Sequence, residues 1–471
     1  MASTTSLPSV ATRTVSQPAP DGMGSGLFAT TDIEPGQDVL HVKTPFVAVL
    51  DSPILEDHCA CCFTPEQKIR GRLVKRCTGC RAVKYCDKVL PNNIRALLRI
   101  VLRVEHKYDA KELKIFEDLQ THVPELEASG HLNRIKQTAR AVKNYSGTKL
   151  DEGTIVNYAA MLDANCLRLQ SAFYDRIGLY LHPYASLINH SCDYNSVVGF
   201  DRQELYVRAK RPIKKGQQIF ISYIDATTPR YVRRRELKER YFFDCHCLKC
   251  VWGHDTLEDR FLSPPRDKAT IVAANREALE LRRIALAPDT KPADRIQKTE
   301  AAMRRLRATG VWPLTRQPYP SWRDDLIVHS PDAGRLPLAL IHAAIRSLRI
   351  DPLMYDKSDP IRLSNLWTLG ETIIIFAARQ ESVRSNPKDP VRVHDFDLNF
   401  SCLLFKILAQ IMAAESESPT VPTFRSVIEH HLATLNTQYK AKGRDLYENK
   451  PFVAFEWRRL EALVDKALEK E

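Results

Sequence analysis

Residues 189–195 read Asn189-His190-Ser191-Cys192-Asp193-Tyr194-Asn195, and a later segment reads Cys245-His246-Cys247-Leu248-Lys249-Cys250. The later segment holds three thiols in six residues, a density that cysteines of an ordinary apolar core do not reach. Cys192 in the first segment supplies a fourth thiol, and four thiolates are the ligands of a closed tetrahedral zinc site. The two segments therefore predict a structural zinc site that leaves no coordination position for a catalytic water.

Most of the other cysteines are also grouped. The chain has twelve cysteines, and six of them lie in two tight clusters: Cys59, Cys61, Cys62, Cys77, Cys80 and Cys86. Cys-x-x-Cys spacing in a chain without an export signal favours zinc and a reducing compartment over disulfides. Cys166 and Cys402 stand apart, and we predict that both are plain core residues.

Composition limits the class of protein. The chain has 471 residues, of which 44% are hydrophobic and 27% are charged, as in soluble globular proteins of two or three domains. It has no run of about eighteen apolar residues, so no membrane-spanning helix is expected. Residues 1–20 are rich in Ser, Thr, Pro and Ala and lack the apolar centre of a secretory signal, so we predict a disordered tail.

The formal net charge of +12 could attract nucleic acid or an acidic partner, or it could belong to a solvated surface. The basic stretches lack the stacking aromatics of a nucleic-acid module, so nucleic acid is not expected to be the main ligand.

Apolar periodicity divides the chain into segments. Alternating residues predict short strands in residues 21–50 and 179–224, and spacing of three and four residues predicts helices over residues 92–175. A basic helix is expected at residues 228–242. From residue 255 to residue 471 the pattern is helical, which predicts an all-α domain; a tetratricopeptide-like array is one option, although no fixed-period repeat is present.

Three segments are candidate ligand contacts, and each also has a simpler structural interpretation. Met23-Gly24-Ser25-Gly26-Leu27 is either a turn or a loop whose glycines let the backbone approach a ligand. Asn189-His190 follows the apolar residues 185–188, which we interpret as a strand, and lies beside a predicted zinc ligand. Tyr223 is either a core aromatic or a phenol at the end of a strand face, where it enters the cavity that this face lines.

In order and spacing these segments resemble the SET-domain lysine methyltransferases, specifically the SET and MYND domain subfamily. Residues 23–27 resemble the first SET motif, and Asn189-His190-Ser191-Cys192 resembles the Asn-His-Ser-Cys-x-Pro-Asn motif. Lys215-Gly216-Gln217-Gln218-Ile219, which leads into Tyr223, resembles Gly-Glu-Glu-Leu and its following tyrosine. Residues 241–247 resemble the post-SET segment, so the likeness spans residues 21–252.

The resemblance implies an α+β fold with a β-rich SET core that contains a pseudoknot. The implied parts are the N-terminal part of the SET core (21–57), a degenerate MYND-type zinc finger (58–91), a helical SET insert (92–175), the C-terminal part of the SET core (176–242), a post-SET zinc loop (243–254) and a helical C-terminal domain (255–471).

The resemblance also implies S-adenosyl-L-methionine (AdoMet) as methyl donor and a lysine side chain of a protein, histone or not, as acceptor. The implied cofactor contacts are Gly24, Ser25, Gly26, Asn165, Asn189, His190 and Phe243. Tyr180 and Tyr241 are the implied walls of a lysine channel, where desolvation lowers the pKa of the lysine amine. Tyr223 would orient the amine and the methyl group, because its own high pKa makes it a poor base.

Four residues depart from the family motifs outside the finger. Tyr194 stands in place of a proline, Gln217 and Gln218 replace the paired glutamates, and Met23 replaces a basic residue.

The finger itself lacks ligands. Its predicted ligands are Cys59, Cys62, Cys77, Cys80 and Cys86. Leu90 stands where a further cysteine is expected, and the closing His-x-x-x-Cys is absent. Either the finger is truncated or decayed, or it holds a single zinc on its first four cysteines; a zinc count per chain distinguishes these cases.

A second function remains open beside the enzyme. The damaged finger and the glutamines at 217 and 218 fit a catalytically weak scaffold or transcriptional co-regulator that binds proteins through the finger or the C-terminal helices. A third hypothesis, a DNA-binding zinc protein, is supported only by the positive net charge. We expect a monomer located in the nucleus, the cytoplasm or both.

Overall fold

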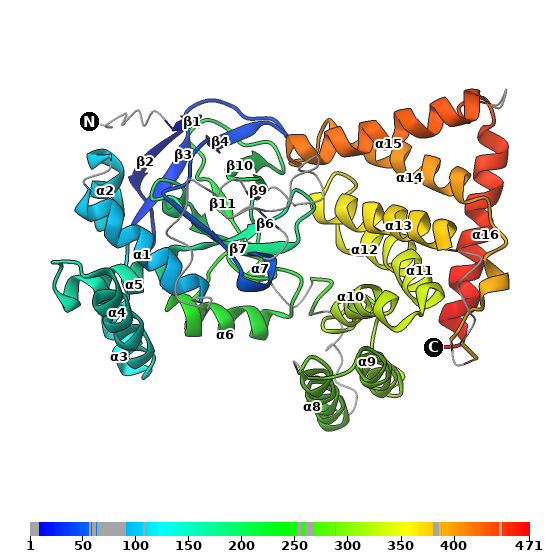
Figure 1. Ribbon diagram of the computed structural model, residues 1–471, viewed down its shortest axis with the longest axis horizontal. Coiled ribbons are helices and arrows are strands. Elements are labelled where there is room, and N and C mark those ends of the chain that lie inside the picture. The colour runs from blue at the N-terminus through cyan, green and yellow to red at the C-terminus, as the bar shows by residue number, and fades with distance from the viewer. Residues whose placement is uncertain are drawn as a thin grey trace. The chain divides into compact units, whose positions relative to one another are not determined.

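The computed structural model describes residues 9–55, 58, 63, 91–106, 109–252, 256–259, 268–287, 289–379, 386–387, 389–441 and 445–471. The chain falls into two compact units. One comprises Met1–Ile224, Arg235–Cys245 and Pro419–Phe424, and the other comprises Asp225–Arg234, His246–Ser418 and Arg425–Glu471. In Figure 1 the strands run from blue to green, and the chain from α8 to α16 is helical.

The first unit is built on small sheets. One has four strands in the order β1 (Val10–Thr12), β4 (Asp38–Val42), β10 (Glu204–Ala209) and β9 (Ser196–Asp201). Another has three, in the order β5 (Val47–Leu50), β7 (Arg176–Leu181) and β6 (Leu167–Gln170). Alternation explains the four-stranded sheet, because Leu40 and Val42 are fully buried whereas His41 between them is not.

Two short strand pairs bring the motif segments together. β2 (Thr14–Pro18) is antiparallel to β3 (Ser25–Ala29), and β8 (Asn189–His190) is parallel to β11 (Phe220–Ile221). The backbone N–H of Ile219 donates to the carbonyl of Leu27 at 2.7 Å. Three segments that are far apart in the sequence therefore lie side by side around β8.

Five helices cover the three-stranded sheet. They are α1 (Asn92–Glu105), α2 (Ala110–Glu117), α3 (Val123–Ala128), α4 (Leu132–Ser146) and α5 (Glu152–Asn165). The stripe predicted for α1 is buried, with Leu97 and Val101 fully inside a core shared with Val47 and Leu181. Asp151 begins α5 by accepting a hydrogen bond from the Thr154 N–H at 2.9 Å.

The helices that follow confirm the helical pattern of the C-terminal half. They are α6 (Arg230–Tyr241), α7 (Leu248–Val251), α8 (Lys268–Ala285), α9 (Pro292–Arg307), α10 (Tyr319–His329), α11 (Leu336–Ile345), α12 (Asp351–Met354), α13 (Pro360–Arg379), α14 (Phe400–Glu415), α15 (Pro422–Lys440) and α16 (Lys450–Glu469). A π-helical stretch, Arg346–Ile350, links α11 to α12. Among the described residues, no helix has both the length and the apolar character needed to cross a membrane.

Three local expectations need correction. Residues 10–18 are not a disordered tail: their β-branched residues form β1 and β2, which pair with β4 and β3. Residues 185–187 form a 3₁₀ helix and not a strand. The helical insert ends at Asn165, and residues 167–170 form β6, because Leu167 and Leu169 alternate with polar residues beside β7.

The segment Pro419–Phe424, here called the strap, packs against β9 and β10. Thr420, Val421 and Phe424 are buried, and Val421 lies so close to Gly199 that a side chain there would collide with it. Asp201, at the end of β9, accepts hydrogen bonds from the N–H of Thr423 at 2.9 Å and from its hydroxyl at 2.7 Å. The strap thus packs as part of the first unit.

Replacing Asp201 by Ala is expected to lower the free energy of unfolding by about 1–2 kcal/mol, because both donors of Thr423 lose their acceptor. Thr423→Val removes only the hydroxyl donor, so its effect should be smaller. Urea denaturation of the two variants and the parent measures the difference. Equal stability of all three proteins would contradict this role for Asp201.

Candidate active site and metal centre

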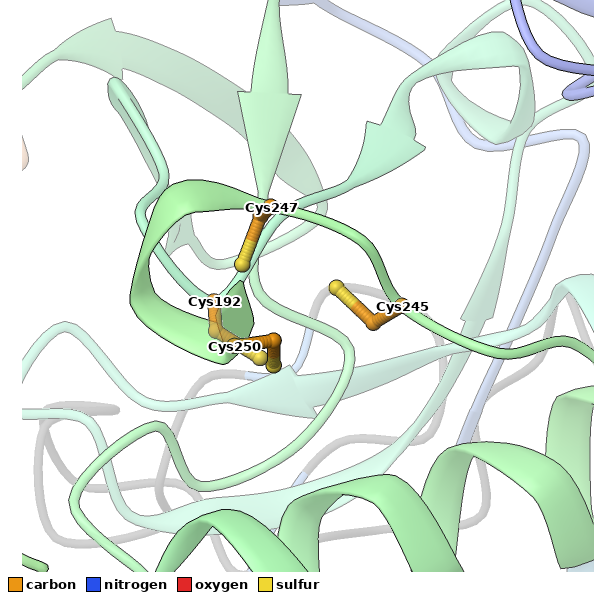
Figure 2. A group of neighbouring side chains, drawn as sticks. All are labelled: Cys192, Cys245, Cys247 and Cys250. Atoms are coloured by element: carbon orange, nitrogen blue, oxygen red, sulfur yellow. The ribbon is translucent and has the colours of Figure 1, made fainter. Parts of the chain in front are cut away.

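The four cysteines predicted to bind zinc come together. The sulfur atoms of Cys192, Cys245, Cys247 and Cys250 lie within 4.8 Å of one another, and the four side chains are grouped together in Figure 2. Three of them are buried and Cys247 is half-buried, and all four are free of disulfides.

Local structure explains the spacing of the last two thiols. Cys247 caps α7, and the N–H of Cys250 donates to the Cys247 carbonyl at 2.9 Å. This turn carries the Cys250 sulfur back toward Cys247. In a tetrahedral site with Zn–S bonds of about 2.3 Å the sulfurs stand about 3.8 Å apart. The donor set therefore fits a structural zinc ion with small movements of the side chains.

His190 connects the thiol cluster to Tyr223. Its Nδ1 accepts the backbone N–H of Tyr223 at 3.0 Å, and its Nε2 lies 3.3 Å from the sulfur of Cys192. Because Nδ1 is the acceptor, the ring proton of the neutral imidazole is on Nε2 and faces the sulfur. The buried His190 ring thereby fixes the backbone of Tyr223 relative to a predicted metal ligand.

Tyr223 is held at the edge of a cluster of aromatic rings. Its hydroxyl donates to the Ile188 carbonyl at 2.6 Å. Its ring centroid is 5.0 Å from that of Tyr241 and 5.3 Å from that of His190. Burial, with a smaller contribution from Tyr241, raises the pKa of Tyr223 above its usual value, so the phenol stays protonated at neutral pH.

Phe243 and Tyr241 extend the cluster of aromatic rings around Tyr223. The ring of Phe243 lies 5.9 Å from His190, and the Tyr241 hydroxyl donates to the Tyr223 carbonyl at 3.4 Å. Burial also raises the pKa of Tyr241. These rings can therefore limit the access of water to a reacting amine. The neutral phenol oxygens can accept hydrogen bonds from that amine.

The glycine loop lies beside Asn189. Gly24 has a φ of +71°, and no atom lies within 4 Å of the position that a Cβ would take. The amide of Asn189 donates to the carbonyl of Ser25 at 3.0 Å. At Gly26 a Cβ would stand 2.5 Å from Nε2 of Gln218. Bare backbone at Gly24 and a tight approach at Gly26 fit a site where a ligand lies along the loop.

Two of the predicted site residues, Asn165 and Tyr180, make their described contacts outside the glycine loop and the ring cluster of Tyr223. Asn165 ends α5, where its amide donates to the carbonyls of Gln120 and Met161 at 2.9 and 2.8 Å. Tyr180 is fully buried on β7, with its ring 5.0 Å from that of Phe200. Their roles in cofactor binding and in the lysine channel stay predictions. The predicted finger ligands Cys59, Cys62, Cys77, Cys80 and Cys86 lie outside the described residues.

Two groups in the site escaped the sequence interpretation. The carbonyl of Ile188 accepts the Tyr223 proton, and every residue carries such a carbonyl, so no sequence signal marks it. The amide of Gln218 lies against Gly26 and close to Asn189. Gln218 stands where the family motif has a glutamate, and this difference was the sequence signal that could have marked it. The sequence did not indicate which way the Gln218 side chain points.

Comparison with known proteins agrees with this geometry. The SET domain family model matches residues 24–224. "SET domain and MYND-type zinc finger protein 6" of Schizosaccharomyces pombe is 29% identical over 261 residues, which cover 50% of this chain and 51% of that protein. "Histone-lysine N-methyltransferase SMYD3" of Mus musculus is 24% identical over 259 residues, 48% of this chain and 59% of that protein. The chain thus spans little more than half the length of these relatives.

A solved structure, "Crystal structure of the SET domain of LSMT bound to Lysine and AdoHcy", aligns over 90% of this chain and 88% of that one. Its sequence identity is 13% and its TM-score is 0.29, which is too low to compare the arrangement of parts. The sequence matches and the convergence of the motif segments around β8 lead to one assignment. Residues 24–224 form a SET domain, and the chain is similar to proteins that are named for SET and MYND domains.

Proposed function

We propose that this protein transfers a methyl group from AdoMet to a lysine side chain of a protein substrate. The observation that carries the proposal is the setting of Tyr223, whose hydroxyl is held by the Ile188 carbonyl at the edge of the ring cluster of His190, Tyr241 and Phe243. Two curated relatives of this chain are named lysine methyltransferases, which supports the same activity here.

The residues around β8 would hold the cofactor. Gly24, Ser25 and Gly26 offer backbone, Asn189 lies beside them, and Phe243 offers an aromatic face for a purine. When bound, AdoMet supplies an electrophilic methyl group on a sulfonium ion. The open backbone at Gly24 agrees with a ligand that lies along the loop.

The chain's own groups would prepare the acceptor. A lysine amine is nucleophilic only when neutral, and the half-buried aromatic rings around Tyr223 would lower its pKa by replacing water. The Tyr223 hydroxyl donates its hydrogen bond to the Ile188 carbonyl. The lone pairs of the phenol oxygen therefore remain free to accept a hydrogen bond from the amine N–H. Tyr223 would therefore act by alignment, which suits an in-line displacement.

The finer parts of the fold are included in this proposal. The Cys192, Cys245, Cys247 and Cys250 cluster supports a post-SET zinc loop, and the parallel pairing of β8 with β11 is compatible with the SET pseudoknot. The degenerate MYND-type finger at residues 58–91 is proposed from sequence alone.

AdoMet binding and methyl transfer test the proposal separately. Calorimetry with the purified protein should give saturable AdoMet binding, and mass spectrometry of a cell lysate treated with protein and labelled AdoMet should give label on lysines. No binding at high micromolar AdoMet would favour the scaffold function. AdoMet binding without label on lysine would support the proposed cofactor site but would overturn the proposal that lysine is the methyl acceptor.

Replacing Gly26 by Ala is expected to disturb the cofactor site directly. The new Cβ would stand 2.5 Å from Gln218 Nε2 and 3.0 Å from the Asn189 amide, so both side chains must move. We expect AdoMet binding to weaken by about tenfold or more, equivalent to about 1.4 kcal/mol, and measure it by calorimetry.

Gly22→Ala is the matched control for this change. Gly22 has a φ of +73° with no atom near its Cβ position, so alanine there costs about 1–2 kcal/mol of backbone strain without crowding Asn189. AdoMet affinity should stay near that of the parent. Equal losses in the two variants would indicate general destabilisation of the loop.

A further inference from the structure

Gln218 has a side chain buried within the proposed cofactor site. The residue is 9% exposed, and its Nε2 donor has no hydrogen-bond partner among the described residues. Its backbone is fixed, because the Gln218 carbonyl accepts from the Asn195 amide at 2.9 Å and the residue pairs with Phe28 in an antiparallel bridge. A buried donor without an acceptor costs free energy, so this amide needs an explanation.

The side chain points toward the cofactor-binding segments. A Cβ built on Gly26 would meet Gln218 Nε2 at 2.5 Å and Asn189 Nδ2 at 3.0 Å. The two amides therefore converge on the same face of the glycine loop. Anything that changes the charge of Gln218 acts directly beside Gly26 and Asn189.

Two aspartates, Asp32 and Asp193, lie on loops next to the Gln218 segment. Asp32 is 2.9 Å from Lys214, and Asp193 is 2.8 Å from Arg211. These two carboxylates of the neighbouring loops are thus already paired with cations. The motif position that Gln218 occupies is a glutamate in the family pattern, and here it carries a neutral amide.

We infer that Gln218 is a specificity-determining residue, whose neutral amide leaves the site with weak discrimination between cationic AdoMet and its neutral product S-adenosylhomocysteine (AdoHcy). This inference rests on the proposed methyl transfer. The sulfonium of AdoMet carries a positive charge that AdoHcy lacks, so a carboxylate at this position would favour the substrate over the product. With glutamine there, the product is retained nearly as well and inhibits further turnover.

Gln218→Glu tests the inference through a ratio of affinities. Calorimetry at pH 8 gives the Kd of AdoHcy divided by the Kd of AdoMet for parent and variant. We expect the ratio to rise about tenfold in the variant, as for a unit charge added near a cation in a partly buried site. A defect of folding weakens both ligands alike and does not produce this shift.

The neighbouring Gln217 gives a matched control. It is exposed, so Gln217→Glu adds the same charge where water and salt screen it, and the ratio should not change. If Gln218→Glu does not fold, as judged by its thermal melt, Gln218→Asp repeats the test with a shorter acid.

The outcomes separate the two proposals. If the parent binds neither ligand, the proposed methyl transfer fails and the inference falls with it. If the parent binds both ligands but the ratio is the same in the acidic variants, or Gln217→Glu shifts it equally, only the role of Gln218 is overturned.

Discussion

Tyr223→Phe is expected to reduce methyl transfer by about a hundredfold or more, the loss that follows when a reacting group is misplaced by about 1 Å. The variant keeps the ring that packs against His190 and Tyr241 but loses the oxygen that would align the amine. AdoMet binding should be nearly unchanged, because the proposed cofactor contacts lie on other residues. Single-turnover assays with labelled AdoMet and calorimetry on the same preparation separate the two effects.

Tyr241→Phe is the control for the tyrosine hydroxyl. It removes a longer hydrogen bond of 3.4 Å, to the Tyr223 carbonyl, so turnover should fall much less. Because burial raises the pKa of Tyr223, the phenol stays neutral, and the parent's rate should show no loss from its ionisation up to about pH 10. Near-normal turnover of Tyr223→Phe would remove this residue from the mechanism.

Cys250→Ser is expected to remove about one equivalent of zinc per chain, because a closed site needs four thiolates. The melting temperature should fall markedly, since the free energy of binding a structural metal is part of the folding free energy. Cofactor affinity should fall too, because His190 lies against Cys192 and holds the backbone of Tyr223. Elemental analysis, thermal melts and calorimetry measure the three effects.

Cys402→Ser is the matched control, because Cys402 is equally buried in α14 and lies outside the thiol cluster. Its zinc content should equal that of the parent, although its stability can fall. Identical zinc content in Cys250→Ser and Cys402→Ser would refute the four-thiol site. The total for the parent also reports on the finger: one zinc indicates the thiol cluster alone, and two indicate a finger that still binds metal.

The parts of the site that depend on side-chain chemistry were predictable from sequence. Cysteines at Cys-x-Cys-x-x-Cys spacing have few roles other than metal binding. The cluster with Cys192 could therefore be predicted from sequence as a zinc site, and the four sulfurs do lie close together. The buried stripe of α1 followed from periodicity for the same reason: a repeat of three and four residues has one physical explanation.

The parts that depend on long-range pairing were not predictable. Residues 10–18 look like a polar tail until β3 and β4 supply their partners. Tyr180 sits among core residues of the sheets because its strand, β7, lies between β5 and β6, and no local pattern fixes which face of a strand is covered. The direction of the Gln218 side chain likewise follows from a bridge to Phe28 that is distant in sequence.

The strap has a practical consequence for expression of the SET domain alone. Pro419–Phe424 is encoded after the bulk of the helical half, yet Val421 and Phe424 fill space against Gly199 and Phe173. A fragment that ends at Cys250 would expose the apolar surface that Val421 and Phe424 cover. It would also remove Thr423, whose N–H and hydroxyl donate to Asp201. Such a fragment should aggregate unless a peptide of the missing residues is fused back or added in solution.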